Sequence, residues 1–205
     1  DRVSQLLVNP RDADRIYVLA GADPPLYVSD LSTLRWRTPL AGVSLSDAWL
    51  LAHAGGEVLY LVSNEGLFRS ADAGDTWHVV ESAPTEILVA SRVALHPADP
   101  DTLYLAHPSD GVYRSTDGGQ SFALINTGLT NLSVNTLAID PQNPQTLYAG
   151  TDDGAFISFD GGEHWGAVNE GLLGATVIYS IAVDPNDPGN VYAATPYGVF
   201  KLEAQ

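Results

Sequence analysis

A tyrosine that follows an aliphatic residue recurs through this chain at a nearly constant interval. The successive tyrosines are separated by 43, 44, 44 and 44 residues, and they are Tyr17, Tyr60, Tyr104, Tyr148 and Tyr192. A fixed period over the whole chain indicates an array of structural repeats and not a set of unrelated domains. We therefore expect a single domain of five repeats, which occupy approximately residues 1–40, 41–82, 83–126, 127–169 and 170–205.

The fourth repeat breaks into four short apolar runs separated by turn residues. The runs are VNTLAI (134–139), TLYAGT (146–151), GAFISF (154–159) and HWGAV (164–168), which we name strands A, B, C and D. Short runs rich in β-branched and aromatic residues and bounded by turn residues predict β-strands. No stretch of the chain keeps a helical period over ten residues. Four strands in a repeat of about 44 residues are typical of one blade of a β-propeller.

The sequence therefore predicts an all-β chain that forms a five-bladed β-propeller. The fifth repeat contains only strands A to C, so its blade is expected to have three strands. Lys201 and Glu203 lie on one face of its last strand, and charges in such a place discourage pairing with another chain. A closed ring of five blades is the favoured arrangement. The alternative is that the chain forms part of a larger propeller of six to eight blades.

An octet of polar and aromatic residues stands between strands C and D in three of the repeats. Its copies are SADAGDTW (70–77), STDGGQSF (115–122) and SFDGGEHW (158–165). Glycine supplies a positive φ, and the Ser and Asp side chains can bind backbone amides that the strands leave over. Because a catalytic centre is normally built once, the repeated octet predicts a structural turn. The residues assigned to this role are Ser70, Asp72, Gly74, Trp77, Ser115, Asp117, Gly119, Phe122, Ser158, Asp160, Gly162 and Trp165.

A weak calcium site is the alternative for the octets. Calcium takes about six to eight oxygen ligands, whereas each octet offers one or two carboxylates. We therefore expect no metal site and no cofactor.

The octet resembles the Asp-box motif, S-x-D-x-G-x-[ST]-[WF], of BNR-like repeat β-propellers. The copy at 158–165 departs from the motif with His164 in place of a hydroxyl residue, and the first repeat has Leu31 and Thr33 in place of the Asp and Gly. The repeats resemble those of sialidases, xyloglucanase-type glycoside hydrolases, sortilin-like receptors and photosystem II assembly factors. This resemblance implies that the boxes lie on the periphery, on the face opposite an active site.

A ligand is therefore expected at the other face, around the channel mouth, where the B–C turns and the D–A connections meet. The candidate ligand-binding residues are Asn64, Glu65, Arg92, His107, Asp110, Asp152, Asp153 and Tyr197. Each has a structural alternative. Asp and Asn before Gly are ordinary turn formers, His107 precedes a proline in a loop, and Arg92 could pair with a carboxylate of the next blade.

The sequence favours a binding role over catalysis. A sialidase resemblance would imply an arginine triad that binds the substrate carboxylate. The arginines of this chain are not expected to form that triad at the channel mouth, because Arg69 and Arg114 stand just before the boxes and therefore on the opposite side. A xyloglucanase-type hydrolase needs two carboxylates across a cleft, and Asp152 or Asp153 with Glu65 or Asp110 could supply them. Those hydrolases, however, place two large propellers face to face. We expect a non-catalytic binding or scaffold module. The alternatives are a glycoside hydrolase or a fragment of one, and an engineered or excised repeat array without a ligand.

The charge restricts the partners of such a module. Twenty-five acidic against nine basic side chains give a net charge of −16, which repels nucleic acid and anionic membranes. No run approaches 18 apolar residues, so membrane insertion is not expected. A protein or glycan ligand is the expected partner, and the chain is expected to be a monomer. The absence of cysteine leaves the compartment open, with a secreted or periplasmic location favoured.

Overall fold

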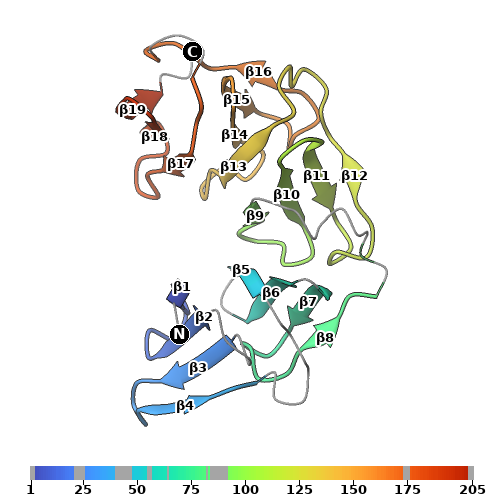
Figure 1. Ribbon diagram of the computed structural model, residues 1–205, viewed down its shortest axis with the longest axis vertical. Coiled ribbons are helices and arrows are strands. Elements are labelled where there is room, and N and C mark those ends of the chain that lie inside the picture. The colour runs from blue at the N-terminus through green and yellow to red at the C-terminus, as the bar shows by residue number, and fades with distance from the viewer. Residues whose placement is uncertain are drawn as a thin grey trace. The chain divides into compact units, whose positions relative to one another are not determined.

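The computed structural model describes residues 3–20, 26–39, 48–54, 57–63, 65–81, 83, 92–172 and 176–202. These residues form strands and turns and include no helix (Figure 1). The all-β fold predicted from the sequence is therefore confirmed. Nowhere in the described part of the chain is there a helix with the length and apolar character that a membrane crossing requires.

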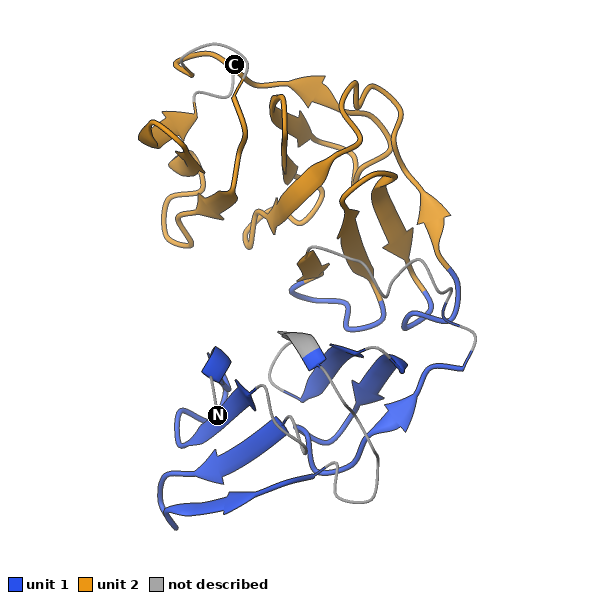
Figure 2. Ribbon diagram, viewed as in Figure 1, with its two compact units in different colours: residues 1–88, 97–101, 117–121 blue, residues 89–96, 102–116, 122–205 orange. Residues whose placement is uncertain are grey.

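The chain divides into two compact units, which are described separately (Figure 2). Unit 1 comprises residues 1–88, 97–101 and 117–121, and unit 2 comprises residues 89–96, 102–116 and 122–205. Two loops of the third repeat therefore belong to unit 1, while the strands of that repeat belong to unit 2.

Unit 1 contains two four-stranded sheets in which strands that follow one another in the chain pair antiparallel. Sheet one consists of β1 (Val3–Val8), β2 (Arg15–Ala20), β3 (Leu26–Asp30) and β4 (Arg35–Arg37). Sheet two consists of β5 (Ala48–Ala54), β6 (Val58–Ser63), β7 (Gly66–Ser70) and β8 (His78–Val79). These strands are A to D of the first two repeats.

Unit 2 contains three sheets of the same kind. Sheet three consists of β9 (Arg92–Leu95), β10 (Leu103–His107), β11 (Gly111–Ser115) and β12 (Ala123–Leu124). Sheet four consists of β13 (Val134–Ile139), β14 (Leu147–Thr151), β15 (Gly154–Ser158) and β16 (Gly166–Ala167). Sheet five consists of β17 (Ser180–Val183), β18 (Val191–Thr195) and β19 (Gly198–Leu202). The described part of the last repeat thus has three strands, as expected, and closure of a five-bladed ring stays a prediction.

The recurring tyrosine explains the period of the sequence, because it joins neighbouring repeats. The ring is buried in the first four repeats, with exposed fractions of 1% to 4%. In unit 1, the Tyr17 hydroxyl donates to the carbonyl of Ala73 in the next repeat (2.9 Å), and the Tyr60 hydroxyl donates to that of Pro100 (3.0 Å). Burial raises the pKa of both hydroxyls, so they remain protonated donors at neutral pH. In the first two repeats the tyrosine therefore links its own repeat to the next, whereas Tyr192 of the fifth repeat is 42% exposed.

The Asp boxes form closed hydrogen-bond networks. In the box at 70–77, the Ser70 hydroxyl donates to Asp72 Oδ1 (2.8 Å) and accepts the Gly74 amide (2.8 Å). Asp72 also accepts the amide (2.8 Å) and the hydroxyl (2.6 Å) of Thr76. Asp117 accepts the corresponding two bonds from Ser121, at 2.9 Å and 2.5 Å. The carboxylate therefore satisfies the amides of the turn, as the scaffold interpretation requires.

The box at 158–165 keeps this network although its hydroxyl residue is missing. His164 donates its backbone amide to Asp160 Oδ1 (2.9 Å), and its Nδ1 lies 2.7 Å from Asp160 Oδ2. The imidazole N–H thus replaces the threonine or serine hydroxyl of the other boxes, because both groups can donate one hydrogen bond to the carboxylate.

Acid should weaken the fold through the box carboxylates. Burial raises the pKa of Asp72, but the hydrogen bonds from Thr76, Ser70 and Asp75 outweigh it and lower the pKa from 3.8 to about 2. The backbone amide and side chain of His164 likewise lower the pKa of Asp160 to about 2. A depressed pKa contributes stability that is present above the unfolded pKa and is lost as the pH falls through the folded one. We expect the denaturation midpoint to fall between about pH 4 and pH 2.

Asp160→Asn should reduce this acid-dependent loss while lowering the midpoint at pH 7, since an amide replaces the carboxylate that accepts the bonds of His164. Asp153→Asn is the matched control, because Asp153 contacts its turn through its backbone amide, which donates to Thr151 Oγ1 at 3.0 Å. Denaturant unfolding at pH 7, 5, 4, 3 and 2 measures the effect. An unchanged pH profile in Asp160→Asn would contradict the assignment.

Candidate functional site

In the three sheets that have an Asp box, the B–C turn lies at the end of the sheet opposite the box. In four sheets the last residue of strand B pairs with the glycine that begins strand C. The pairs are Ser63 with Gly66, His107 with Gly111, Thr151 with Gly154, and Thr195 with Gly198. All four glycines have φ between 92° and 140°, a conformation that side chains rarely adopt. The strands therefore end at one defined place in each repeat.

The last residue of strand B also caps its own turn. The side-chain oxygen accepts the amide two residues ahead, at 3.1 Å in Ser63 and at 3.0 Å in Thr151 and Thr195. The two threonine hydroxyls donate in turn to the carbonyl of the glycine, at 2.9 Å and 3.0 Å. The backbone of these turns is fixed from inside, which leaves the two middle residues exposed to solvent in the Thr151 and Thr195 turns.

His107 takes this capping position in sheet three. Its ring is 6% exposed, and its Nδ1 accepts the amides of Ser109 (3.2 Å) and Asp110 (3.0 Å). Tyr113 packs edge-on against the imidazole at 5.9 Å, and the Tyr113 hydroxyl donates to Asp110 Oδ2 (3.2 Å). Because Nδ1 accepts these bonds, the ring proton of the neutral imidazole is on Nε2. The candidates His107 and Asp110 therefore belong to one hydrogen-bonded turn.

The D–A connections clamp two of these turns through equivalent asparagines. Asn126 Oδ1 accepts the amide of Val112 (2.8 Å), and its Nδ2 donates to the carbonyl of Asp110 (2.7 Å). Asn169 Oδ1 accepts the amide of Ala155 (2.8 Å) in the next sheet. The preceding glycines, Gly111 and Gly154, have no room for a side chain, since a Cβ would lie 2.3 Å and 2.4 Å from these oxygens. These bonds hold the backbone of the two turns in sheets three and four.

Four of the candidate residues are exposed on unit 2. Asp152 and Asp153 are the middle residues of the turn that follows β14, and Tyr197 occupies the same place in the turn after β18. The Tyr197 ring is 68% exposed. Arg92 is the first residue of β9 and pairs with Ala106, one residue before His107, so it lies at the turn end of sheet three. These side chains are accessible to a ligand.

The other two candidates belong to unit 1. Glu65 accepts a hydrogen bond from the Ser63 hydroxyl at 3.1 Å, so its carboxylate folds back on its own turn. Asn64 lies outside the described residues.

Two polar or aromatic residues on this face of unit 2 were not among the sequence candidates. Tyr179, which immediately precedes β17, is 58% exposed, and its amide donates to the carbonyl of Ala194 (2.9 Å) at the turn end of sheet five. Asn135 Nδ2 donates to Asp152 Oδ1 (2.8 Å) and so positions that carboxylate. In the sequence, the feature that could have identified Tyr179 as a site residue is its place as an aromatic residue at the start of a strand A.

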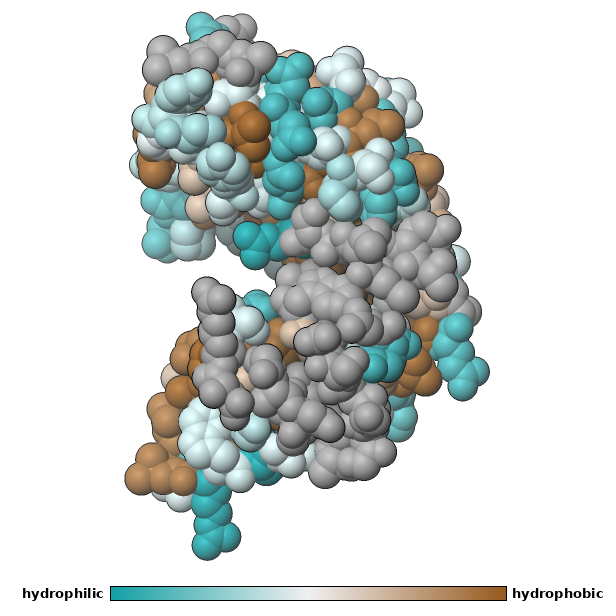
Figure 3. Space-filling view, viewed as in Figure 1, coloured by the Kyte–Doolittle hydropathy of each residue, from teal (hydrophilic) through white to brown (hydrophobic). Residues whose placement is uncertain are grey.

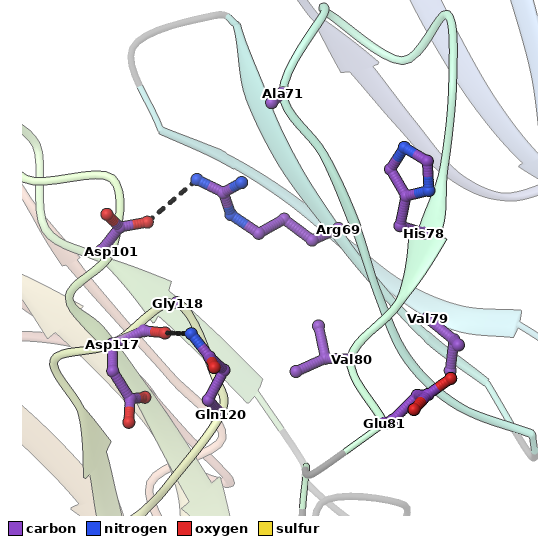
Figure 4. Close-up of a pocket in the computed structure, with 10 residues that line it drawn as sticks. All are labelled: Arg69, Ala71, His78, Val79, Val80, Glu81, Asp101, Asp117, Gly118 and Gln120. Atoms are coloured by element: carbon purple, nitrogen blue, oxygen red, sulfur yellow. Dashed lines mark hydrogen bonds and ion pairs between the residues drawn. The ribbon is translucent and has the colours of Figure 1, made fainter.

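A pocket of about 690 Å³ lies in unit 1 beside β8, near the Asp-box end (Figure 4). Arg69 projects across it and its guanidinium donates to Asp101 (2.9 Å), while Gln120 Nε2 donates to the carbonyl of Asp117 (2.9 Å). The Arg69 guanidinium and the Gln120 amide of this pocket therefore already form hydrogen bonds within the protein. Within the ranges that the structure describes, no three His, Asp or Glu side chains gather as metal ligands would.

The described residues form small antiparallel sheets, four of which have four strands, and three of the sheets have an Asp box between strands C and D. These features define a class of protein, the Asp-box β-propeller. Solved structures agree. The GH74 enzyme of Niastella koreensis superposes on 96% of this chain with a TM-score of 0.72 at 20% identity, over 33% of its own length. YCF48 from Cyanidioschyzon merolae superposes on 93% of the chain with a TM-score of 0.65 at 12% identity, over 66% of its length. At these low sequence identities, structural similarity shows that the folds are alike and nothing more. The predicted β-propeller fold is thereby confirmed.

The sequence comparison is more specific. The profile of the Sortilin-Vps10 family (sortilin, neurotensin receptor 3) matches residues 65–192, and the chain belongs to this family. The predicted resemblance to sortilin-like repeats is thereby confirmed. A xyloglucanase of Hypocrea jecorina is 28% identical over 137 residues, which cover 60% of this chain and 16% of the xyloglucanase. The chain thus matches a small part of that relative's length.

Proposed function

We propose that the chain is a non-catalytic binding module whose ligand is a glycan, held at the B–C turn face of unit 2. The observation that carries this proposal is the combination of two exposed tyrosine rings, Tyr179 and Tyr197, with the exposed carboxylates of Asp152 and Asp153. An aromatic ring offers an apolar face to the C–H groups of a sugar, and a carboxylate accepts hydrogen bonds from sugar hydroxyls.

The rigidity of the face supports binding. The caps of Thr151 and Thr195 and the clamp of Asn169 fix the backbone of the turns, and Asn135 holds the Asp152 carboxylate. Side chains that are already positioned lose little conformational entropy when a ligand arrives. Figure 3 shows one face of unit 2, on which hydrophilic and hydrophobic residues are mixed.

The comparisons suggest which glycan to test first. The curated relative is a xyloglucanase, and several similar structures are GH74 enzymes. We therefore propose xyloglucan, a neutral polysaccharide, as the first ligand to test. A protein ligand remains the other expectation from the sequence.

A second function, part of a glycoside hydrolase, is favoured by the same comparisons. Hydrolysis of a glycosidic bond requires two carboxyl groups, about 5 to 10 Å apart, on either side of the bond. Asp152 or Asp153 would supply one of them, and the second would come from another part of the protein. Asp152 Oδ1 accepts a hydrogen bond from Asn135 Nδ2, and a carboxylate positioned as an acceptor suits recognition of sugar hydroxyls. Binding without turnover is therefore the preferred proposal.

The test is titration of the chain with xyloglucan oligosaccharides by calorimetry, together with a screen for released reducing ends. Tyr197→Ala should weaken binding about tenfold or more, which corresponds to about 1.4 kcal/mol. Phe159→Ala is the matched control, because Phe159 is 61% exposed in the same unit but lies in the Asp box. Its affinity should equal that of the parent chain.

Two outcomes would contradict the proposal. Equal losses in Tyr197→Ala and Phe159→Ala, or no saturable binding, would remove the glycan site from this face. Turnover abolished by Asp152→Asn or Asp153→Asn would replace the binding module by the hydrolase.

A further inference from the structure

A second groove, of about 450 Å³, lies in unit 1 along the outer strand β4. Three arginines and a tryptophan line it together with two carboxylates. These residues are Asp12, Arg15, Asp30, Arg35, Trp36 and Arg37. Only nine side chains of the whole chain are Lys or Arg, so a third of them border this groove. Its volume falls within the range of about 300 to 1,000 Å³ that small-molecule sites occupy.

Two of the arginines are held together by one carboxylate. Arg15 and Arg37 both donate an Nη2 hydrogen to Asp75 Oδ1. A guanidinium has five N–H donors, so this shared bond fixes the position of both groups while most of their donors remain. The Nε of Arg15 is buried and has no hydrogen-bond partner among the described atoms. A buried donor without a partner is costly unless a water or a ligand satisfies it.

Arg35 and Trp36 complete the groove from β4. Arg35 is exposed and forms no ion pair with any residue in the described ranges. Trp36 is 54% exposed, whereas Trp165, at the same place in its box, is 6% exposed. The exposed indole therefore stands beside arginine donors. Figure 3 shows further hydrophobic surface at the end of unit 1 where the turn between β3 and β4 lies, and there Leu34 is 78% exposed.

The charges of the groove are balanced and not repulsive to an anion. Asp30 Oδ1 accepts the hydroxyl (2.5 Å) and the amide (2.9 Å) of Ser32, and these bonds lower the pKa of Asp30. Asp12 accepts the amide of Asp14 (3.2 Å). Asp12 and Asp30 of the groove and Asp75, which binds two of its arginines, together balance the three guanidiniums. The rest of the chain carries 22 acidic against six basic side chains, from totals of 25 and nine. Recognition then depends on the planar fork of arginine, which matches a carboxylate in two bonds.

We propose that this groove binds a sugar ring that bears a carboxylate, a uronic acid residue. Arg35 and the remaining donors of Arg15 and Arg37 bind the carboxylate, and the ring of the sugar packs on the Trp36 indole. The proposal is independent of the glycan site of unit 2, since the two sites share no residue and the ligand proposed there is neutral.

The experiment is calorimetric titration of the full chain with digalacturonate and, separately, with the matching neutral galactose disaccharide. Arg35→Ala and Trp36→Ala should each weaken digalacturonate binding about tenfold or more, and the neutral sugar should bind at least about tenfold more weakly than the acidic one. Arg11→Ala is the control. Arg11 is an exposed arginine of the same unit that pairs with Glu57 (3.5 Å) outside the groove. Arg35→Lys should restore only part of the affinity, because lysine lacks the fork.

Because Arg35 is exposed, its variants should fold. They therefore test the site even if Trp36→Ala does not fold. Acrylamide quenching of the parent chain and of Trp36→Phe, without ligand, reports whether the Trp36 indole is accessible. Three binding results would overturn the site: equal affinity for the acidic and neutral sugars, unchanged binding in Arg35→Ala, or no saturable binding. The site would also be overturned if the Trp36 indole were protected from acrylamide because another part of the protein covers it. Loss of xyloglucan binding in Tyr197→Ala would leave this proposal untouched.

Discussion

Replacement of Gly128 by alanine is expected to destabilise unit 2 by at least about 3 kcal/mol, through strain and a backbone clash. Gly128 has φ of 87°, and an added Cβ would lie 2.2 Å from the carbonyl oxygen of Trp165. The neighbouring hydrogen bond, from the amide of Trp165 to the carbonyl of Thr127 (2.8 Å), holds the two segments at this distance. Because the clash is with backbone, no side-chain rotation relieves it. Denaturant unfolding of Gly128→Ala and of the parent chain at neutral pH measures the loss in the free energy of unfolding.

Gly166→Ala is the matched control for this substitution. Gly166 adjoins Trp165 in the chain, is exposed, and has no atom within 4 Å of the position that a Cβ would take. Its replacement should change the free energy of unfolding by no more than about 0.5 kcal/mol. Similar losses in the two variants would show that the close approach of the D–A connection and the box is not what stabilises the unit.

Strands A, B and C of the fourth repeat were predictable from the sequence, whereas strand D was not. The predicted strand A of the fourth repeat, residues 134–139, coincides with β13, and strands B and C differ from β14 and β15 by one residue each. Strand D was predicted as 164–168, but β16 contains only Gly166 and Ala167. The reason is local. The Trp165 amide bonds to Thr127 in the connection and its Nε1 donates to the carbonyl of Ile125 (2.7 Å), so the residue leaves the ladder.

The turn residues of the candidate site were predictable because strand ends follow directly from the repeat. What they contact was not. Asn135 contacts Asp152, and Asn126 contacts the turn before Val112, within a single repeat but across its strands, so these contacts depend on side-chain geometry that the local sequence pattern does not encode. The repeated N-x-G at 126–128 and 169–171 was the available indication of the asparagine clamp. The motif alone does not show which backbone groups these asparagines bind, because the turns they contact lie 14 residues or more away in the chain.

The distribution of roles within the repeat bears on where function resides. The positions that repeat are used by the scaffold: the tyrosine of strand B, the cap of the B–C turn, its glycine and the Asp box. The middle residues of the turns differ between repeats, with Asp152 and Asp153 in one and Pro196 and Tyr197 in another. A ligand that recognises one face must therefore contact these variable positions, and three residues of the proposed glycan site, Asp152, Asp153 and Tyr197, occupy them.

Trp165→Ala is the second large effect that we expect, a loss of about 3 to 5 kcal/mol. The indole is 6% exposed and packs in the core of unit 2 with Tyr104 of sheet three and with Ile125 and Leu129 of the connection that follows β12. Its truncation removes a large apolar contact and leaves the buried Ile125 carbonyl without its 2.7 Å donor. Denaturant unfolding followed by near-ultraviolet circular dichroism measures the loss.

Two further variants separate packing from hydrogen bonding at this position. Trp165→Phe should lose less than the alanine variant, because it keeps an aromatic ring and lacks only the N–H, and the box at 115–122 naturally has Phe122 there. Trp77→Ala should also lose less, since Trp77 is only partly buried against the core of unit 1. If Trp165→Phe were as unstable as Trp165→Ala, the hydrogen bond to Ile125 would carry the stabilisation. Equal losses in Trp77→Ala and Trp165→Ala would contradict the link between burial and stability, because a half-exposed and a buried indole would then contribute alike.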